Sequence, residues 1–228
     1  MFKIFPYSYR LKLLLPLFYL INKSGLKNLL RPEYIGKLNK RVASLYEMLP
    51  EVNSPVSGAL PNFIPSKTNS RYKVVLLSGC IQSVFFSKIN KATVDVLTQN
   101  GCDVYIPQDQ GCCGALSVHS GRLEEGREFA RDLIDSFFKQ EIDYEIVNSS
   151  GIGTKMKEYD EIFKDDKEYS EKASVFSEKT KDIMEFMVEI GIESPLNDLN
   201  LKVTYQDACH IVHGQKIRNQ PRELLNMI

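Results

Sequence analysis

Short apolar runs alternate with helical stretches from residue 73 onward, and this alternation limits the possible folds more than any other feature. Each run is five or six residues long and rich in Val, Ile, Leu or Tyr, as buried parallel strands are. We predict strands at residues 73–77, 103–107, 144–148 and 201–206. We predict helices at residues 83–99, 121–140, 155–164 and 168–190. The pattern indicates an α/β fold, with an open, mainly parallel sheet and flanking helices.

A helical, basic segment is expected before this sheet. Two helices are predicted at residues 9–30 and 34–49, and a Pro- and Ser-rich linker ends near residue 70. Residues 1–73 contain 12 Lys and Arg against three Asp and Glu, although the whole chain has a formal charge of zero. The neutral total argues against a globally basic nucleic-acid binder, and the uneven distribution indicates parts with different roles.

The apolar run at residues 13–21 has three possible meanings. Nine residues are too few to span a bilayer, which needs about 20. No small-x-small cleavage site follows, which argues against a signal peptide. An amphipathic helix kinked at Pro16 that packs on the protein is the favoured interpretation. Contact with a membrane surface is the alternative.

Five cysteines suit metal or redox chemistry better than disulfides. The count is odd and two of them are adjacent, so a reducing, intracellular setting is expected. Four of the five follow predicted strands, at the sheet edge where α/β proteins collect functional groups: Cys80, Cys112, Cys113 and Cys209. The fifth, Cys102, is expected to be a small buried hydrophobic residue.

The Gly-flanked pair Cys112–Cys113 is the most informative motif. Thiolates hold iron–sulfur clusters, and glycine lets the backbone of such a loop approach closely. Zinc is a second possibility, because it accepts mixed sulfur and nitrogen ligands and because His210 and His213 follow Cys209. For His210 a local hydrogen bond that shapes the turn is favoured over metal binding. His119, just after the pair, is a candidate for the same crevice.

An internal similarity suggests a repeat. Residues 73–80 and 202–209 each contain a lysine, a predicted strand and then a cysteine in the turn that follows. We therefore predict three parts. They are a helical connector and linker at residues 1–70, a first α/β repeat at 71–200, and the start of a second repeat at 201–228.

Seven blocks in the same order resemble the cysteine-rich CCG-domain family, above all the iron–sulfur subunits of glycolate oxidase (glycolate dehydrogenase). Related domains occur in heterodisulfide reductases. The blocks are residues 4–7, 77–80, 107–116, 119–122, 147–154, 205–210 and 213–225. Several blocks in one order are far more specific than a single Cys-Cys-Gly.

The resemblance implies an electron-transfer role in the oxidation of glycolate, or alternatively lactate. It implies a [4Fe–4S] cluster held by Cys80, Cys112, Cys113 and Cys209, with His210 as a weaker candidate. It assigns no catalytic residue to this chain, because a flavin-containing partner subunit would oxidise the hydroxyacid. Electrons would pass to a membrane or quinone-side acceptor. The expected location is the cytoplasm, with peripheral contact at the inner face of the membrane, and no nucleic-acid partner.

The sequence departs from the family pattern in ways that favour a fragment of a larger subunit. No cysteine precedes Cys80, so the family's ferredoxin-like module has no counterpart here. Ile152 occupies a position where the family has cysteine, and isoleucine cannot bind iron. The second repeat has no Cys-Cys-Gly. A zinc-binding or thiol-redox module with a structural or interaction role is therefore the rival hypothesis.

Overall fold

The computed structural model describes residues 2–24, 52, 54, 56 and 58–228. The chain divides into two compact units. The first combines Met1–Ala59 with Cys80–Ser87, and the second combines Leu60–Gly79 with Lys88–Ile228. The predicted helix at residues 34–49 lies outside the described residues.

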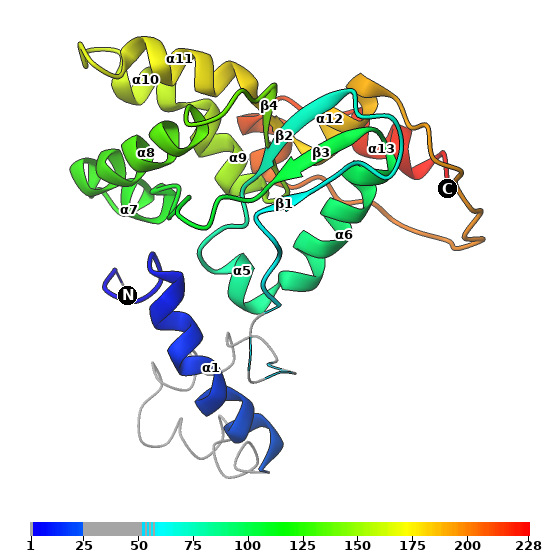
Figure 1. The fold of residues 1–228 in the computed structure, drawn as a ribbon, viewed down its shortest axis with the longest axis horizontal. Coiled ribbons are helices and arrows are strands. Elements are labelled where there is room, and N and C mark those ends of the chain that lie inside the picture. The colour runs from blue at the N-terminus through cyan, green and yellow to red at the C-terminus, as the bar shows by residue number, and fades with distance from the viewer. Residues whose placement is uncertain (1, 25–51, 53, 55, 57) are drawn as a thin grey trace. The chain divides into compact units, whose positions relative to one another are not determined.

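The second unit is built on a five-stranded sheet in the order β1-β3-β2-β4-β5 (Figure 1). Its strands are β1 (Phe63–Ile64), β2 (Tyr72–Leu76), β3 (Cys102–Tyr105), β4 (Tyr144–Val147) and β5 (Thr180–Asp182). Four strands are parallel, and only the edge strand β1 runs antiparallel to its neighbour β3. The α/β architecture predicted from the sequence is confirmed.

Each face of the sheet carries its own hydrophobic core, because successive side chains of a strand point to opposite faces. Val74 and Leu76 of β2 lie in one core, and Val75 lies in the other. The core that contains Val74 and Leu76 is covered by α6 (Ser87–Gln99) and α12 (Ile183–Ile190). The core that contains Val75 is covered by four helices: α8 (Leu123–Phe137), α9 (Ser150–Lys157), α10 (Tyr159–Phe163) and α11 (Ser170–Lys179).

The first unit is organised around α1 (Ser8–Lys23) and α5 (Gln82–Phe85). Leu11 and Leu15 of α1 are buried together with Val84 of α5 in a separate small core. The rings of Phe18 and Phe85 extend this contact, with centroids 6.4 Å apart. The helix α1 continues through Pro16. None of the described helices is both long and apolar enough to cross a membrane.

Three predicted helices are divided in the structure. The helix expected at residues 83–99 is α5 followed by α6, with a break at Phe86. The helix expected at 155–164 is α9 followed by α10, with a break at Glu158. The helix expected at 121–140 is the single helix α8, and a separate helix, α7 (Ala115–His119), precedes it. The helix expected at 168–190 is interrupted by β5, which pairs with β4. Strand β1 was also not expected, since its residues lie in the predicted linker.

The strand predicted at residues 201–206 is wrong. This stretch is extended without regular structure, and Leu201 and Val203 are exposed. A strand needs a neighbour to satisfy its backbone groups, and no strand of the described residues pairs with this one. The chain then forms the π-helical turn η1 (His210–Gly214) and the short helix α13 (Gln220–Leu225).

Candidate functional site

The carboxyl ends of β2 and β4 form the point where the strand order changes direction. The chain passes from β2 to β3 on one side and then crosses to β4 on the other side. In open α/β sheets this switch point is where ligands bind. The Cys-Cys-Gly loop follows β3 and reaches the same edge of the sheet through the contacts described next.

The Cys-Cys-Gly loop is buried and tightly packed. Cys112 and Cys113 are both enclosed, and the N–H of Gly114 donates to Cys112 Sγ at 3.4 Å. Gly114 has a φ of 72°, which L-residues with a side chain rarely adopt. An added Cβ there would lie 2.5 Å from the carbonyl oxygen of Gly126 in α8. The glycine is therefore required for the loop to approach the α8 backbone.

Tyr159 anchors the Cys-Cys-Gly loop to the hydrophobic core. Its hydroxyl donates to the carbonyl oxygen of Cys113 at 2.6 Å, and its ring is stacked on Phe176 in the core. Burial, followed by the neighbouring thiols of Cys113 and Cys112, raises the pKa of Tyr159 well above its usual value. The hydroxyl therefore keeps its proton and remains a donor. The sequence analysis did not identify Tyr159, because it lies 46 residues from Cys113 and no local motif links the two.

Gln110 joins the loop to the end of β2. Its side-chain oxygen accepts from the N–H of Ser78 at 2.5 Å, and its amide nitrogen donates to the Leu76 carbonyl at 3.2 Å. Gln110 is buried, so both contacts are shielded from water. The glutamine was visible in the motif, but its role was not predictable without the fold.

Two asparagines extend the same network to β4. Asn90 of α6 donates to the Ser78 carbonyl at 2.8 Å. Asn148, directly after β4, donates to Asn90 Oδ1 at 3.1 Å and to Thr93 Oγ1 at 2.9 Å. Buried polar networks whose members are satisfied hold a single arrangement. The network therefore fixes the turns that follow β2, β3 and β4.

Cys209 and His210 lie at the start of η1, which is seated on α9. Thr154 of α9 donates to the His210 carbonyl at 3.0 Å, and Gln215 donates to the Ser150 carbonyl at 3.1 Å. Gly153 permits this approach, since an added Cβ would lie 2.6 Å from Gln215 Nε2. Cys209 itself is exposed.

His119 and His210 come together, although they are far apart in the chain. Their ring centroids are 6.0 Å apart in an edge-on arrangement. Burial, followed by the charge of Lys155 and by His210, lowers the pKa of His119. Lys155 is buried beside them and is paired with Glu158 at 2.5 Å. The sequence placed His119 near the Cys-Cys-Gly loop, and the structure adds His210 as its neighbour.

The four predicted cysteine ligands are divided between the two units. Cys80 is half-buried and belongs to the first unit, whereas Cys112, Cys113 and Cys209 belong to the second. Within the described residues, no three His, Cys, Asp or Glu side chains are grouped as a metal site. Ile152 is half-buried at the start of α9 and offers no ligand atom. The thiol chemistry suits an iron–sulfur cluster, but the described arrangement does not assemble a full ligand set.

Cys102 is separate from these residues. It is fully buried in β3, and burial raises the pKa of its thiol to about 12. A thiol that stays protonated is a poor ligand and a poor nucleophile. The prediction that Cys102 packs as a small hydrophobic residue is confirmed.

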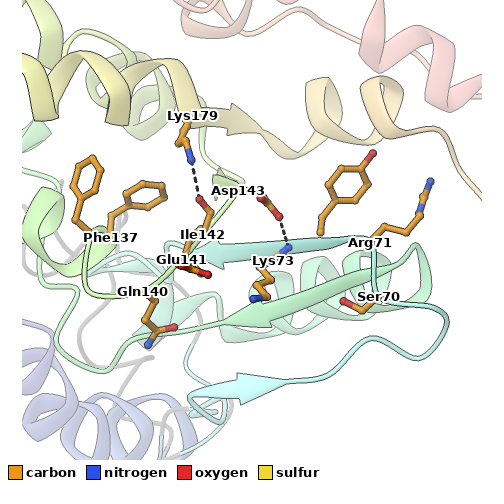
Figure 2. A pocket seen from close by; sticks show the side chains of 11 residues that line it. Ser70, Arg71, Lys73, Phe137, Gln140, Glu141, Ile142, Asp143 and Lys179 are labelled. Atoms are coloured by element: carbon orange, nitrogen blue, oxygen red, sulfur yellow. Dashed lines mark hydrogen bonds between the residues drawn. The ribbon is translucent and has the colours of Figure 1, made fainter.

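A hollow of about 530 Å³ lies at the amino ends of β2 and β4, opposite to the strand ends that lead to the Cys-Cys-Gly loop (Figure 2). Several of its polar groups are bound within the protein. Lys179 donates to the Ile142 carbonyl at 2.9 Å, and Asp143 accepts from the N–H of Lys73 at 2.8 Å. Arg71 is paired with Glu193 at 3.0 Å. These three groups are therefore engaged within the protein.

The fold and the buried loop define a cysteine-rich α/β domain. Residues 74–156 match the family model described as "CCG: Cysteine-rich domain". Residues 74–156 belong to this cysteine-rich CCG family, as the sequence motifs predicted. No solved structure matches the chain.

Curated relatives cover more of the chain. It is 35% identical over 232 residues to the "Probable glycolate oxidase iron-sulfur subunit" of Bacillus subtilis (strain 168), a match that covers 99% of this chain and 52% of that protein. It is 31% identical over 157 residues to "Lactate utilization protein A" of Geobacillus sp. (strain WCH70), covering 68% of this chain and 65% of that protein. The protein with that name in Bacillus subtilis (strain 168) matches equally well. The chain thus spans about half the length of the first relative.

Proposed function

We propose that this chain is an iron–sulfur electron-transfer component of a flavin-dependent system that oxidises a small 2-hydroxyacid. The observation that carries the proposal is the buried Cys112–Cys113 pair, in a glycine loop anchored by Tyr159 and Gln110. The names of the relatives, a glycolate oxidase iron–sulfur subunit and a lactate utilization protein, support it.

The proposed ligands are Cys112 and Cys113, together with Cys80 and Cys209 and with His210 as a weaker candidate. A bound [4Fe–4S] cluster would supply one-electron transfer. Tyr159 and Gln110 would hold the loop, and the buried loop would keep water from the ligand sulfurs. Cys80 follows Ser78 by two residues, so the covalent chain keeps it within about 7 Å of the network that contains Ser78.

The hydride chemistry of hydroxyacid oxidation belongs to a flavin-containing partner subunit in this proposal, because the cofactor carries out the difficult chemistry. This chain contributes no catalytic residue. It passes electrons to a membrane or quinone-side acceptor at the cytoplasmic face of the membrane. Glycolate is the proposed donor and lactate the alternative.

A zinc or thiol-redox module is the second candidate. It is favoured by the contact between His119 and His210 beside Cys209, which brings nitrogen and sulfur donors to one edge of the sheet. Zinc binds such mixed sets. Its role would be structural or in partner binding.

Anaerobic reconstitution with iron and sulfide separates these candidates. We expect broad visible absorption, an EPR signal on reduction and bound iron. Cys112→Ser and Cys113→Ser should abolish the spectrum, whereas Cys102→Ala, which removes an unrelated buried thiol, should retain it. An unchanged spectrum in Cys112→Ser and Cys113→Ser would contradict the ligand assignment. Zinc without iron would establish the second candidate. Reduction of the cluster by glycolate or lactate through the flavin partner would then identify the donor.

A further inference from the structure

The outward face of α1 carries a continuous apolar stripe. Leu13, Leu17 and Leu20 are spaced four and three residues apart, so at about 100° per residue they lie on one side of the helix. They are 76%, 54% and 61% exposed. The opposite side of α1 contains Leu11 and Leu15, which are buried against α5. The stripe is therefore a second apolar face, separate from the one that packs in the first unit.

Basic side chains flank this stripe. Arg10 lies beside one edge, and Lys12 and Lys23 lie beside the other, when positions are placed at about 100° per residue. Residues 1–24 contain four Lys and Arg and no Asp or Glu. Among the described residues, no carboxylate is paired with any of the three flanking cations. The face therefore combines exposed leucines with positive charge and carries no acidic residue of its own.

Aromatic residues continue the exposed face toward the start of the chain. Tyr9 precedes Leu13 by one turn and is exposed, as is Phe5. The guanidinium of Arg10 lies over the Tyr7 ring, 4.2 Å from its centroid. Aromatic rings with a polar edge are favoured at the boundary between lipid and water.

The length of α1 decides how it can meet a bilayer. Its 16 residues extend about 24 Å, which is shorter than a hydrocarbon core of about 30 Å. A helix with leucines on one side, flanked by lysine and arginine, lies in the plane of a membrane surface. Anionic headgroups attract such an excess of positive charge.

We propose that the Leu13–Leu17–Leu20 face of α1 binds the surface of an anionic phospholipid membrane. The leucines enter the headgroup boundary and the flanking cations contact the phosphates. The inference does not depend on the iron–sulfur cluster, since every residue that carries it lies in the first unit.

Sedimentation of the full chain with lipid vesicles tests the proposal. We expect binding to mixed phosphatidylglycerol and phosphatidylcholine vesicles at low salt, with weaker binding at high salt and to pure phosphatidylcholine. The triple variant Leu13→Gln, Leu17→Gln, Leu20→Gln should bind at least about tenfold more weakly. The matched control Leu199→Gln, Leu201→Gln, Val203→Gln, also exposed leucines and valine, should bind like the parent.

A charge variant tests whether weaker binding could result from misfolding rather than from the loss of the leucines. Lys12→Gln, Lys23→Gln removes two of the flanking cations, leaves the leucines in place and should also weaken binding to anionic vesicles, while circular dichroism and the melting temperature stay unchanged. Equal binding of the parent and the triple variant would overturn the proposal. The proposal would also be overturned if the parent protein does not bind vesicles but forms a dimer that the triple variant does not form. The leucine face would then be a protein interface.

Discussion

Glu145 is a carboxylic acid enclosed in the core on β4. It is 0% exposed, and neither of its oxygens has a hydrogen-bond partner among the described residues. Its neighbours in the register are Val75 and Thr180. Burial raises the pKa of Glu145 well above its usual value. Burial therefore favours the neutral acid in the folded protein, since a buried unpaired charge is far more costly than a buried acid.

Glu145→Gln should flatten the pH dependence of stability. The raised pKa means that the folded state holds a proton which the unfolded chain loses near pH ~4.3. The stabilising effect of that proton is complete below this value and is lost as the pH rises toward the folded-state pKa. The limiting slope is about 1.4 kcal/mol per pH unit.

Urea unfolding from about pH 4 to about pH 8 measures this effect. Glutamine has the shape of the neutral acid, so we expect equal stability at low pH and a variant that becomes more stable than the parent as the pH rises. The exposed Glu178→Gln is the control and should follow the parent. A constant difference between Glu145→Gln and the parent at every pH would rule out a buried neutral acid.

Tyr159→Phe should loosen the Cys-Cys-Gly loop without removing its packing. The ring stays in the core, but the carbonyl of Cys113 loses its buried donor. An unsatisfied buried acceptor costs about 1–3 kcal/mol. We expect that loss in urea unfolding and faster reaction of Cys112 and Cys113 with a thiol reagent. Tyr105→Phe, a partly buried tyrosine beside the same core, is the control. Unchanged thiol reactivity would show that the hydroxyl does not hold the loop.

At the scale of elements, the central strands and the Cys-Cys-Gly loop could be predicted because their signals are local. Apolar runs mark β2, β3 and β4, and glycines mark the turns. The anchors of the loop could not be predicted, because Gln110, Asn148 and Tyr159 act through contacts that depend on the folded sheet. Residues 201–206 show the converse error. Their pattern is that of a strand, but a strand forms only where a neighbour completes its hydrogen bonds.

Strand β5 was missed because it has three residues between two helices. One local signal in the sequence does indicate that a new helix starts directly after β5. Asp182 begins α12 with a capping box, in which its carboxylate accepts from the N–H of Met184 at 2.9 Å and Glu185 caps in return. An aspartate followed three residues later by a glutamate is a helix start. A new helix starting at residue 183 excludes one continuous helix at residues 168–190.

Replacing Asp182 should test how firmly this cap holds α12. Asp182→Ala should destabilise the protein by about 1 kcal/mol, whereas Asp182→Asn should retain the cap. Burial raises the pKa of Asp182 to about 6. The bound proton therefore stabilises the fold below about pH 4, and this contribution is lost as the pH rises to about 6. Asp182→Asn should lack that change in urea unfolding. An alanine variant as stable as the asparagine variant would contradict the capping role.

At the scale of the whole molecule, the two units have cores that share no residue. Leu15 and Val84 belong to the small core of the first unit, and Leu133 belongs to a core of the second. Removal of a buried side chain destabilises chiefly the core that loses its contacts. Each unit should therefore respond separately to substitution in its own core.

The chain contains no tryptophan, so single tryptophans can report on each unit. Phe18→Trp places a probe beside Phe85 in the first unit, and Phe138→Trp places one beside Phe137 in the second. Leu15→Ala should lower the unfolding free energy by about 2–5 kcal/mol at the first probe and leave the second unchanged, and Leu133→Ala should do the reverse. Equal shifts at both probes for either substitution would mean that the units unfold together, because only a shared transition transmits the loss of one core to the other.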